Sequence, residues 1–367
     1  MILHINTSKT WRGGEQQLFY LAEALQSLGK PQIVAGQPNS ELAIRCKAKN
    51  IPFVPIKMRN ELDILSIPAF LKTIDENRIQ LIHAHTAKAH AIALLIKTFR
   101  YYLSLIVSRR VDFHINKNPF SKLKYYSSKN DIFLTVSNKI KDILIEDGVN
   151  PEKVVTVYSG IDLKRFENLP EPTYLKKEFI ISEDTVVIGN VAALVDHKDQ
   201  LTLLQAISLL DTPKRFVFLI VGEGELEEKL KQTAKSLGIL DKVIFTGFRK
   251  DILAFYNLFD VFTLTSKEEG LGTSVLDAMA SGLPVVATKA GGITEMIEHN
   301  KGSFVADIGE NKKLAEYYKT LIEDENLRKT FGNYNKAQVE KFSITQTIKK
   351  TIRIYNLFLD KKIDYKI

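Results

Sequence analysis

The chain has 367 residues, of which 45% are hydrophobic and 26% charged, and its formal net charge is +8. This length favours two domains, and the composition is that of a folded protein and excludes a largely disordered one. No apolar run approaches the roughly 20 residues that a membrane-spanning helix needs. The single cysteine, Cys46, excludes an intrachain disulfide. The N-terminus enters a strand directly and lacks the basic and apolar regions of a signal peptide, so we expect a cytoplasmic protein.

The first residues predict the opening of a doubly wound α/β domain. Residues 2–6 form a strand pattern, a loop with Gly13 and Gly14 follows, and a helical pattern comes next. The apolar residues of that helix are Leu18, Leu21, Ala22 and Leu25. The loop is not G-x-G-x-x-G, so a dinucleotide site is not indicated. Glycine has no Cβ and lets a ligand approach the backbone closely, although a simple tight turn is the other interpretation.

Strand and helix patterns then alternate through the first half. They cover 32–36, 41–49, 53–56, 67–76, 81–84 and 106–110. The strand that begins at Leu81 ends at His85, and a histidine in such a place is often a structural hydrogen-bonding group. The strand from Ile106 ends in Arg109 and Arg110, with His114 four residues on. Either arginine could neutralise an anionic acceptor through bidentate hydrogen bonds.

Basic residues are concentrated in the first half. The segment from Lys97 to Lys129 holds eight Lys or Arg and one acidic residue, Asp112, with aromatic and aliphatic residues between them. Such a segment suits an anionic membrane surface or an anionic acceptor, and a merely solvated basic face is equally compatible with it. Because no nucleic-acid motif accompanies the charge, we expect no nucleic acid as partner.

A second doubly wound domain is predicted after a linker. The linker contains Pro170, Glu171 and Pro172, which places a domain boundary near 168–175. Strand patterns follow at 185–191, at 216–221 before Gly222-Glu-Gly224, and at 243–247. A helical pattern runs from 342 to about 359 at the end of the chain.

The stretch from Ser266 to Gly292 carries the strongest functional signal. A strand pattern at 261–265 leads into a glycine turn at 268–274 and then a short helix, and such an arrangement offers backbone N–H groups to an anion. Glu269 and Asp277 lie eight residues apart around this turn, and carboxylates so placed suit sugar hydroxyls. The alternative is a plain strand–loop–helix with two solvated acids.

This stretch resembles the E-x7-E segment of the retaining family-4 glycosyltransferases, and weaker motifs extend the resemblance to essentially the whole chain. The resemblance implies the GT-B fold, in which two Rossmann-like doubly wound domains face each other across a cleft and a C-terminal helix crosses back. We therefore expect an acceptor-side domain at 1–168, together with the helix at about 344–367. The donor-binding domain is expected at 169–343.

The resemblance also implies roles for particular residues. Glu269 orients the donor sugar, Asp277 holds the ribose, and Lys198 stabilises charge on the departing diphosphate. Further donor-binding residues are Gly14, Gly270, Leu271, Gly272, Thr273, Ser274 and Arg249. The acceptor side or the mouth of the cleft is expected to contain Arg12, Gly13, His85, Arg110 and His114.

The sequence departs from the family pattern at several positions. Ala193 stands where the family has an arginine that clamps the diphosphate, and losing such a cation costs several kcal/mol of transition-state stabilisation. His197, or Arg12 from the facing domain, is expected to replace it. Asp277 replaces a glutamate, Ser159 replaces an asparagine, and Arg110 stands where many members have a histidine.

The implied reaction is transfer of a sugar from a nucleotide-diphosphate-sugar to a hydroxyl, with retention and without a metal or other cofactor. We expect a glycan or lipid-linked acceptor, a pathway such as lipopolysaccharide or capsule assembly, and a location at the inner face of the cell membrane. Two alternatives are a catalytically impaired nucleotide-sugar-binding subunit, suggested by Ala193, and a nucleotide-sugar epimerase of the same fold.

Overall fold

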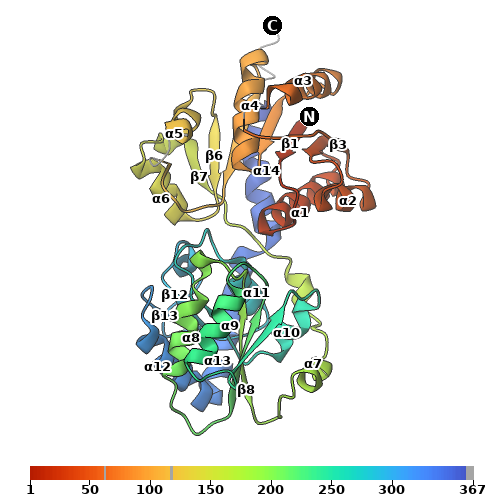
Figure 1. The fold of residues 1–367 in the computed structure, drawn as a ribbon. Helices are drawn as coiled ribbons and strands as arrows, with labels where there is room; N and C mark the ends of the chain where they lie inside the picture. Colours follow the sequence, from red (N-terminus) through yellow and green to blue (C-terminus); the bar gives the residue numbers. More distant parts are fainter. Residues whose placement is uncertain (62, 116–118, 361–367) are drawn as a thin grey trace. The chain divides into compact units, whose positions relative to one another are not determined.

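The computed structural model describes residues 1–61, 63–115 and 119–360, and it divides into two compact units (Figure 1). The first unit is Met1–Ser159 together with the C-terminal segment from Ile344, and the second is Gly160–Ser343. The chain therefore divides between 159 and 160, somewhat before the boundary expected at 168. In the described ranges, no helix is both long and apolar enough to cross a bilayer.

The first unit is built on a parallel sheet whose described strands run in the order β3-β2-β1-β4-β5-β6-β7. These strands are β1 (Ile2–Asn6), β2 (Gln32–Gly36), β3 (Phe53–Pro55), β4 (Leu81–Ala84), β5 (Ser104–Arg109), β6 (Ile132–Thr135) and β7 (Val154–Thr156). Its helices are α1 (Gly13–Ser27), α2 (Glu41–Ala48), α3 (Ile67–Glu76), α4 (Ala87–Phe99), α5 (Pro119–Tyr126), α6 (Asn138–Glu146) and α14 (Ile344–Asp360).

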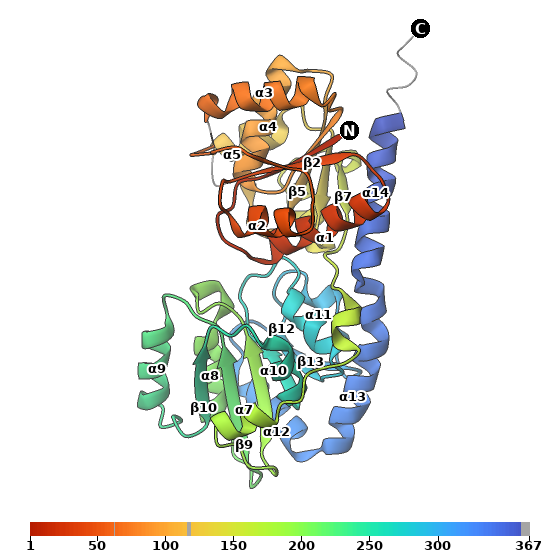
Figure 2. The ribbon, with the colours of Figure 1, turned by 90° about the vertical axis from the view of Figure 1, so that its right-hand side faces the viewer.

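Helices cover both faces of this sheet, so its strands are apolar on both sides, as parallel strands usually are. On one face lies α14 (Figure 2), whose Ile354 and Tyr355 pack with Ile2 of β1 and Ile106 of β5. On the other face, Leu3 and Ile5 of β1 pack in a cluster that includes residues of α3 and α4. The last helix therefore completes the first unit, which confirms the expected C-terminal crossing.

The second unit has a parallel sheet in the order β10-β9-β8-β11-β12-β13. These strands are β8 (Val186–Val191), β9 (Phe216–Val221), β10 (Val243–Gly247), β11 (Val261–Leu264), β12 (Val285–Thr288) and β13 (Ser303–Ala306). Its α-helices are α7 (Thr173–Glu178), α8 (Gln200–Ser208), α9 (Glu227–Ser236), α10 (Ile252–Leu258), α11 (Thr273–Ala280), α12 (Asn311–Glu323) and α13 (Glu325–Gln338). Short 3-10 turns include η4 (Leu163–Phe166) and η5 (Asp196–Lys198).

The strand order of each sheet reverses once. In the first unit the reversal lies between β1 and β4, and in the second it lies between β8 and β11. At such a point the two loops at the carboxyl ends of the strands run in opposite directions and leave a crevice, which is where open α/β sheets bind ligands. The topology therefore marks one candidate crevice in each unit.

The loop after β8 is held by the glycine turn after β9. The N–H of Leu194 donates to Glu223 O at 3.0 Å, and the N–H of Leu226 donates to Leu194 O at 3.1 Å. A Cβ on Gly222 would lie 2.0 Å from Ala192 O, and one on Gly224 would lie 2.3 Å from Leu194 O. Glycine is required at both positions because the turn after β9 lies directly against the backbone of the loop after β8.

We predict that Gly224→Ala lowers the free energy of unfolding by about 3 kcal/mol, because its methyl group would collide with backbone atoms that cannot rotate away. Gly238→Ala is the control: it has a left-handed φ of 67° but no neighbour within 4 Å. It should lose only about 1–2 kcal/mol. Urea unfolding measures both, and an equal loss in the two variants would contradict the packing argument.

Candidate active site

The crevice of the second unit is formed by the loops after β8 and β11. The two loops are hydrogen-bonded to each other: the N–H of Lys267 donates to His197 O at 2.8 Å, and Thr265 Oγ1 donates to Asp199 O at 3.0 Å. Asp199 in turn caps α8, where its carboxylate accepts from Thr202 Oγ1 at 2.7 Å. Each loop therefore fixes the position of the other.

Lys198 and Glu269 meet at this point. Lys198 Nζ and Glu269 Oε2 form an ion pair, and only 18% and 13% of the two side chains are exposed. Ser266 Oγ donates to the same carboxylate oxygen at 3.3 Å. The pair places a cation for phosphate oxygens beside a carboxylate for hydroxyl groups, which are the two kinds of group that a nucleotide sugar presents. The structure thus brings together both residues expected to be catalytic.

The glycine turn after Glu269 leads directly into α11. Gly272 is the N-cap residue of this helix and has a left-handed φ of 90°, and no side chain caps the helix start. A Cβ at Gly272 would lie 3.2 Å from Glu269 Cγ, and the Glu269 carbonyl accepts from the N–H of Gly292 at 3.1 Å. The first amides of a helix have no intrahelical partner and attract anions. The turn from Gly270 to Ser274 is therefore suited to a phosphate group.

Asp277 lies one turn into α11 and is partly buried. Its Oδ1 is fully buried and has no hydrogen-bond partner among the described residues. Burial raises the pKa of Asp277 to about 7, while the positive charge of Arg165 in η4 acts in the opposite direction. A buried carboxyl group without a partner indicates a ligand site, because such groups are almost always hydrogen-bonded.

The glycine loop of the first unit opens α1. Arg12 is the N-cap residue, and its N–H donates to Glu15 Oε2 at 3.1 Å. The other oxygen of Glu15 accepts from Asn6 Nδ2 at 3.0 Å. Gly13 begins the helix, and a Cβ at Gly14 would lie 3.5 Å from Arg110 Cδ. The loop thus covers the Arg110 side chain.

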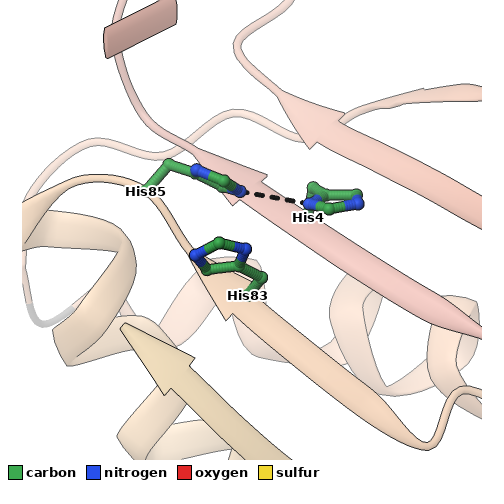
Figure 3. A group of neighbouring side chains, drawn as sticks. All are labelled: His4, His83 and His85. Carbon is green, nitrogen blue, oxygen red and sulfur yellow. Dashed lines mark hydrogen bonds between the residues drawn. The ribbon is translucent and has the colours of Figure 1, made fainter. Parts of the chain in front are cut away.

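His85 and Arg110 point into the first unit. His85 is 4% exposed and belongs to a cluster with His4 and His83 (Figure 3), in which His85 Nε2 lies 3.1 Å from His4 Nδ1. Arg110 Nη1 donates to Ser159 Oγ at 3.2 Å. Arg110, His83 and His85 line a small cavity of about 30 Å³, room for about one water. Because His85 is almost fully buried within this unit, the expectation that it lies at the mouth of the cleft is corrected, while its place on the acceptor side stays a prediction.

Burial dominates the electrostatics of the histidine cluster. It lowers the pKa of His4 to about 3 and the pKa values of His83 and His85 well below the ordinary value, and the nearby Arg110 lowers the latter two further. Three neutral imidazoles can bind a metal, but both nitrogens of His83 are in use. Nδ1 lies 2.5 Å from Tyr355 Oη and Nε2 lies 2.8 Å from Ser108 Oγ. The cluster serves as a buried hydrogen-bond network that ties α14 to the sheet.

Two of the expected site residues are paired with acidic side chains. Arg249 donates to Glu178 Oε1 at 2.6 Å and to Asp251 Oδ1 at 2.9 Å, so the structure uses it to join α7 to the start of α10. His114 Nδ1 pairs with Asp147 Oδ1 at 2.9 Å. The expected roles of Arg249 in donor binding and of His114 on the acceptor side stay predictions.

Some residues of these sites escaped the sequence analysis. Arg165 acts on Asp277 but belongs to no recognisable pattern. Ser266, which donates to Glu269, opens the stretch with the strongest signal but was assigned no role of its own. The histidine cluster could be recognised in part from the sequence, because His83 and His85 are two residues apart along one extended segment and so share a face of the sheet. His4 pairs in register with His83 on the neighbouring strand.

Comparison with known proteins identifies the class. Residues 11–165 match the family model "Glycosyltransferase Family 4", and residues 173–338 match "Glycosyl transferases group 1". The two models together cover both units, and the chain belongs to the glycosyltransferases of this family. This confirms the resemblance on which the expected site residues rest.

Individual relatives are distant. The chain is 25% identical over 307 residues to N-acetyl-alpha-D-glucosaminyl L-malate synthase of Bacillus anthracis, with 80% of this chain and 78% of that protein covered. It is 23% identical to UDP-Gal:alpha-D-GlcNAc-diphosphoundecaprenol alpha-1,3-galactosyltransferase of Escherichia coli, with 85% and 84% covered. The solved structure of Anabaena HepE in complex with UDP-glucose superposes with a TM-score of 0.85 at 23% identity, covering 97% and 99% of the two chains. The fold is GT-B, as expected.

The raised pKa of Asp277 predicts a pH-dependent stability. Its folded pKa of about 7 exceeds the ordinary value of 3.8, so the folded state binds the proton more tightly than the unfolded state. The contribution to stability is therefore complete below pH 4 and is lost as the pH rises through 7. Relative to Asp277→Asn, the wild type should lose up to about 1.4 kcal/mol per pH unit in this window.

Urea unfolding of wild type and Asp277→Asn between pH 4.5 and 8 measures this difference. Parallel stability curves for the two proteins would contradict the buried, protonated state of Asp277.

Proposed function

We propose that this glycosyltransferase moves a sugar from a nucleotide-diphosphate-sugar to a hydroxyl group, with retention of configuration and without a metal ion. The observation that carries the proposal is the meeting of Lys198 and Glu269 at the point where the strand order of the second unit reverses. The uncapped start of α11 and the unpartnered Asp277 supply the remaining groups that a nucleotide sugar needs.

Different residues are proposed to bind different parts of the donor. The diphosphate is proposed to bind to the backbone amides from Gly270 to Ser274 and to Lys198. There the positive ends of the fixed N–H dipoles and the lysine cation stabilise the negative charge that develops on the leaving group. Glu269 accepts hydrogen bonds from hydroxyls of the sugar, and Asp277 accepts them from the ribose. As the bond from the anomeric carbon to the diphosphate breaks, the acceptor oxygen bonds to that carbon and its proton passes to the departing phosphate.

Because Ala193 stands where the family has an arginine, the proposed diphosphate site has one positive charge fewer. Ala193 is exposed on the loop after β8, and its backbone carbonyl accepts from Gln200 Nε2 at 3.1 Å. Its methyl group supplies no charge, so Lys198 carries more of the diphosphate than its counterpart does in a typical relative. His197, exposed on the same loop, is proposed as the second cation.

The acceptor is proposed to be a glycan or a lipid-linked glycan in bacterial surface-glycan assembly, on the cytoplasmic side of the membrane. The relative from E. coli acts, by its name, on a diphosphoundecaprenol-linked sugar. Helix α5 adds support, because Phe120 and Leu123 are 72% and 73% exposed. Lys122 lies between them in a segment of net positive charge. Exposed apolar side chains among lysines suit the surface of an anionic bilayer.

A thermal-shift screen with UDP-, GDP- and ADP-sugars tests donor binding. One donor should raise the Tm, since a ligand at 100 times its Kd adds about 2.7 kcal/mol of stability. Glu269→Ala should lose most of this shift, whereas Glu228→Ala, an exposed glutamate on α9, should keep it. No shift with any donor would contradict the proposal. A bound donor that is never transferred would favour the impaired binding subunit, and its conversion to an epimer would favour the epimerase.

Sedimentation with vesicles containing phosphatidylglycerol tests the membrane contact. The double variant Phe120→Ser/Leu123→Ser should bind roughly thirtyfold more weakly, because partial burial of each side chain in the bilayer contributes about 1 kcal/mol. Ile180→Ser/Leu240→Ser removes two exposed apolar side chains of the second unit and is the control. Equal binding by both variants would exclude α5 as the contact.

A further inference from the structure

A hollow of about 740 Å³ lies in the first unit, apart from all residues that the resemblance assigned. It is lined by residues that follow β1 (Thr7–Lys9), that follow β3 (Lys57–Arg59) and that begin α4 (Thr86–Lys88). The loops after β1 and β4 flank the point where the strand order reverses. The hollow therefore occupies the crevice in which this kind of sheet binds a ligand.

Positive charge dominates the lining. Lys9, Lys57, Arg59 and Lys88 are all exposed, and among the described residues none of them has a carboxylate within the 4.0 Å of an ion pair. The single carboxylate of the lining, Glu61, lies 3.7 Å from Lys124 Nζ and is offset by it. Four cations without counter-charges around one hollow raise the local concentration of anions.

The backbone that carries these cations is fixed by buried hydrogen bonds. Gln37, which is buried, donates to Met58 O at 2.5 Å and accepts from Met58 N at 3.3 Å. The N–H of Arg59 donates to Asp63 Oδ2 at 2.7 Å. Thr7 Oγ1 and Thr86 Oγ1 lie 2.7 Å apart and join the loops after β1 and β4. The four cationic side chains thus extend from backbone segments that these hydrogen bonds hold in place.

The start of α4 adds to the positive potential. Thr86 caps this 13-residue helix by accepting from the N–H of Ala89 at 3.2 Å. The N-terminus of a helix carries a partial positive charge, and here it opens into the hollow beside Lys88. Lys124 of α5 donates to Ala87 O at 3.2 Å, so the helix with exposed Phe120 and Leu123 is joined to the same rim.

We propose that this hollow binds a phosphoryl group of the acceptor, and that its charge matches a diphosphate ester. The identification of the ligand as the acceptor rests on the proposed function; the anion site itself rests on the hollow. A carboxylate carries one negative charge, whereas a diphosphate ester carries two or three and has enough oxygens for several cations at once. Lys57 and Arg59 bind it from the loop after β3, Lys9 binds it from the loop after β1, and Lys88 binds it from the first turn of α4.

Calorimetric titration of inorganic pyrophosphate into protein saturated with UDP tests the site, because UDP occupies the donor crevice of the second unit. The wild type should bind one further equivalent. Lys57→Glu/Arg59→Glu should weaken this binding at least tenfold and leave the UDP affinity unchanged. Lys30→Glu/Lys47→Glu makes the same charge change before β2 and in the last turn of α2, away from the hollow, and should have little effect.

Absence of pyrophosphate binding, or equal weakening by the two double variants, would overturn the proposal. Failure of UDP, GDP and ADP alike to bind would instead count against the proposed function, so the two can fail separately. Farnesyl diphosphate distinguishes the sources of the phosphoryl group. Tighter binding than pyrophosphate, lost in Phe120→Ser/Leu123→Ser, assigns the site to a lipid-linked diphosphate, and equal binding assigns it to a soluble phosphorylated glycan.

Discussion

The ion pair between Lys198 and Glu269 depends on a feature of the sheet as a whole. Two loops separated by about 70 residues of chain meet because β8 and β11 are neighbours whose following connections run in opposite directions. Hydrogen bonds between backbone and side chains of these loops then fix the two charged groups. In the absence of a ligand each charge has the other as its partner, which limits the cost of holding both in a largely buried place. Under the proposed function a donor exchanges partners with this pair: its phosphate oxygens replace Glu269 at Lys198, and its hydroxyl groups replace Lys198 at Glu269.

The alternation of strands and helices was predictable, because a parallel strand that is buried on both faces appears in the sequence as a run of apolar residues. The strands at 32–36 and 81–84 and the donor turn at 268–274 emerge directly from this pattern and its glycines. Helix α7 did not, because it has six residues with only Leu175 buried and directly follows Pro172. That Lys198 and Glu269 belong to one site was anticipated only through the family resemblance, since no local pattern links residues so far apart in sequence, and their ion pair was not anticipated.

The orientations of the side chains in the first unit were harder to predict, because each orientation depends on the residues packed around that side chain. Arg110 ends a strand and reads as an available cation, yet it turns inward to Ser159 and the loop at Gly14 covers it. His85 is buried beside His4 and His83 for a similar reason. The cations of the hollow come from separate loops and from the start of α4, and only the strand order of the sheet shows that they converge.

The first unit is discontinuous in sequence, since α14 joins it only after the whole of the second unit has been made. Until residues 344–360 leave the ribosome, the sheet face at Ile2 and Ile106 lacks the cover of Ile354 and Tyr355. His83 likewise lacks Tyr355 as the partner of its Nδ1. An unfinished chain thus exposes apolar surface and an unpaired buried polar group at the same place, which favours recognition by chaperones and proteases. The last helix makes completion of the first unit conditional on synthesis of the second.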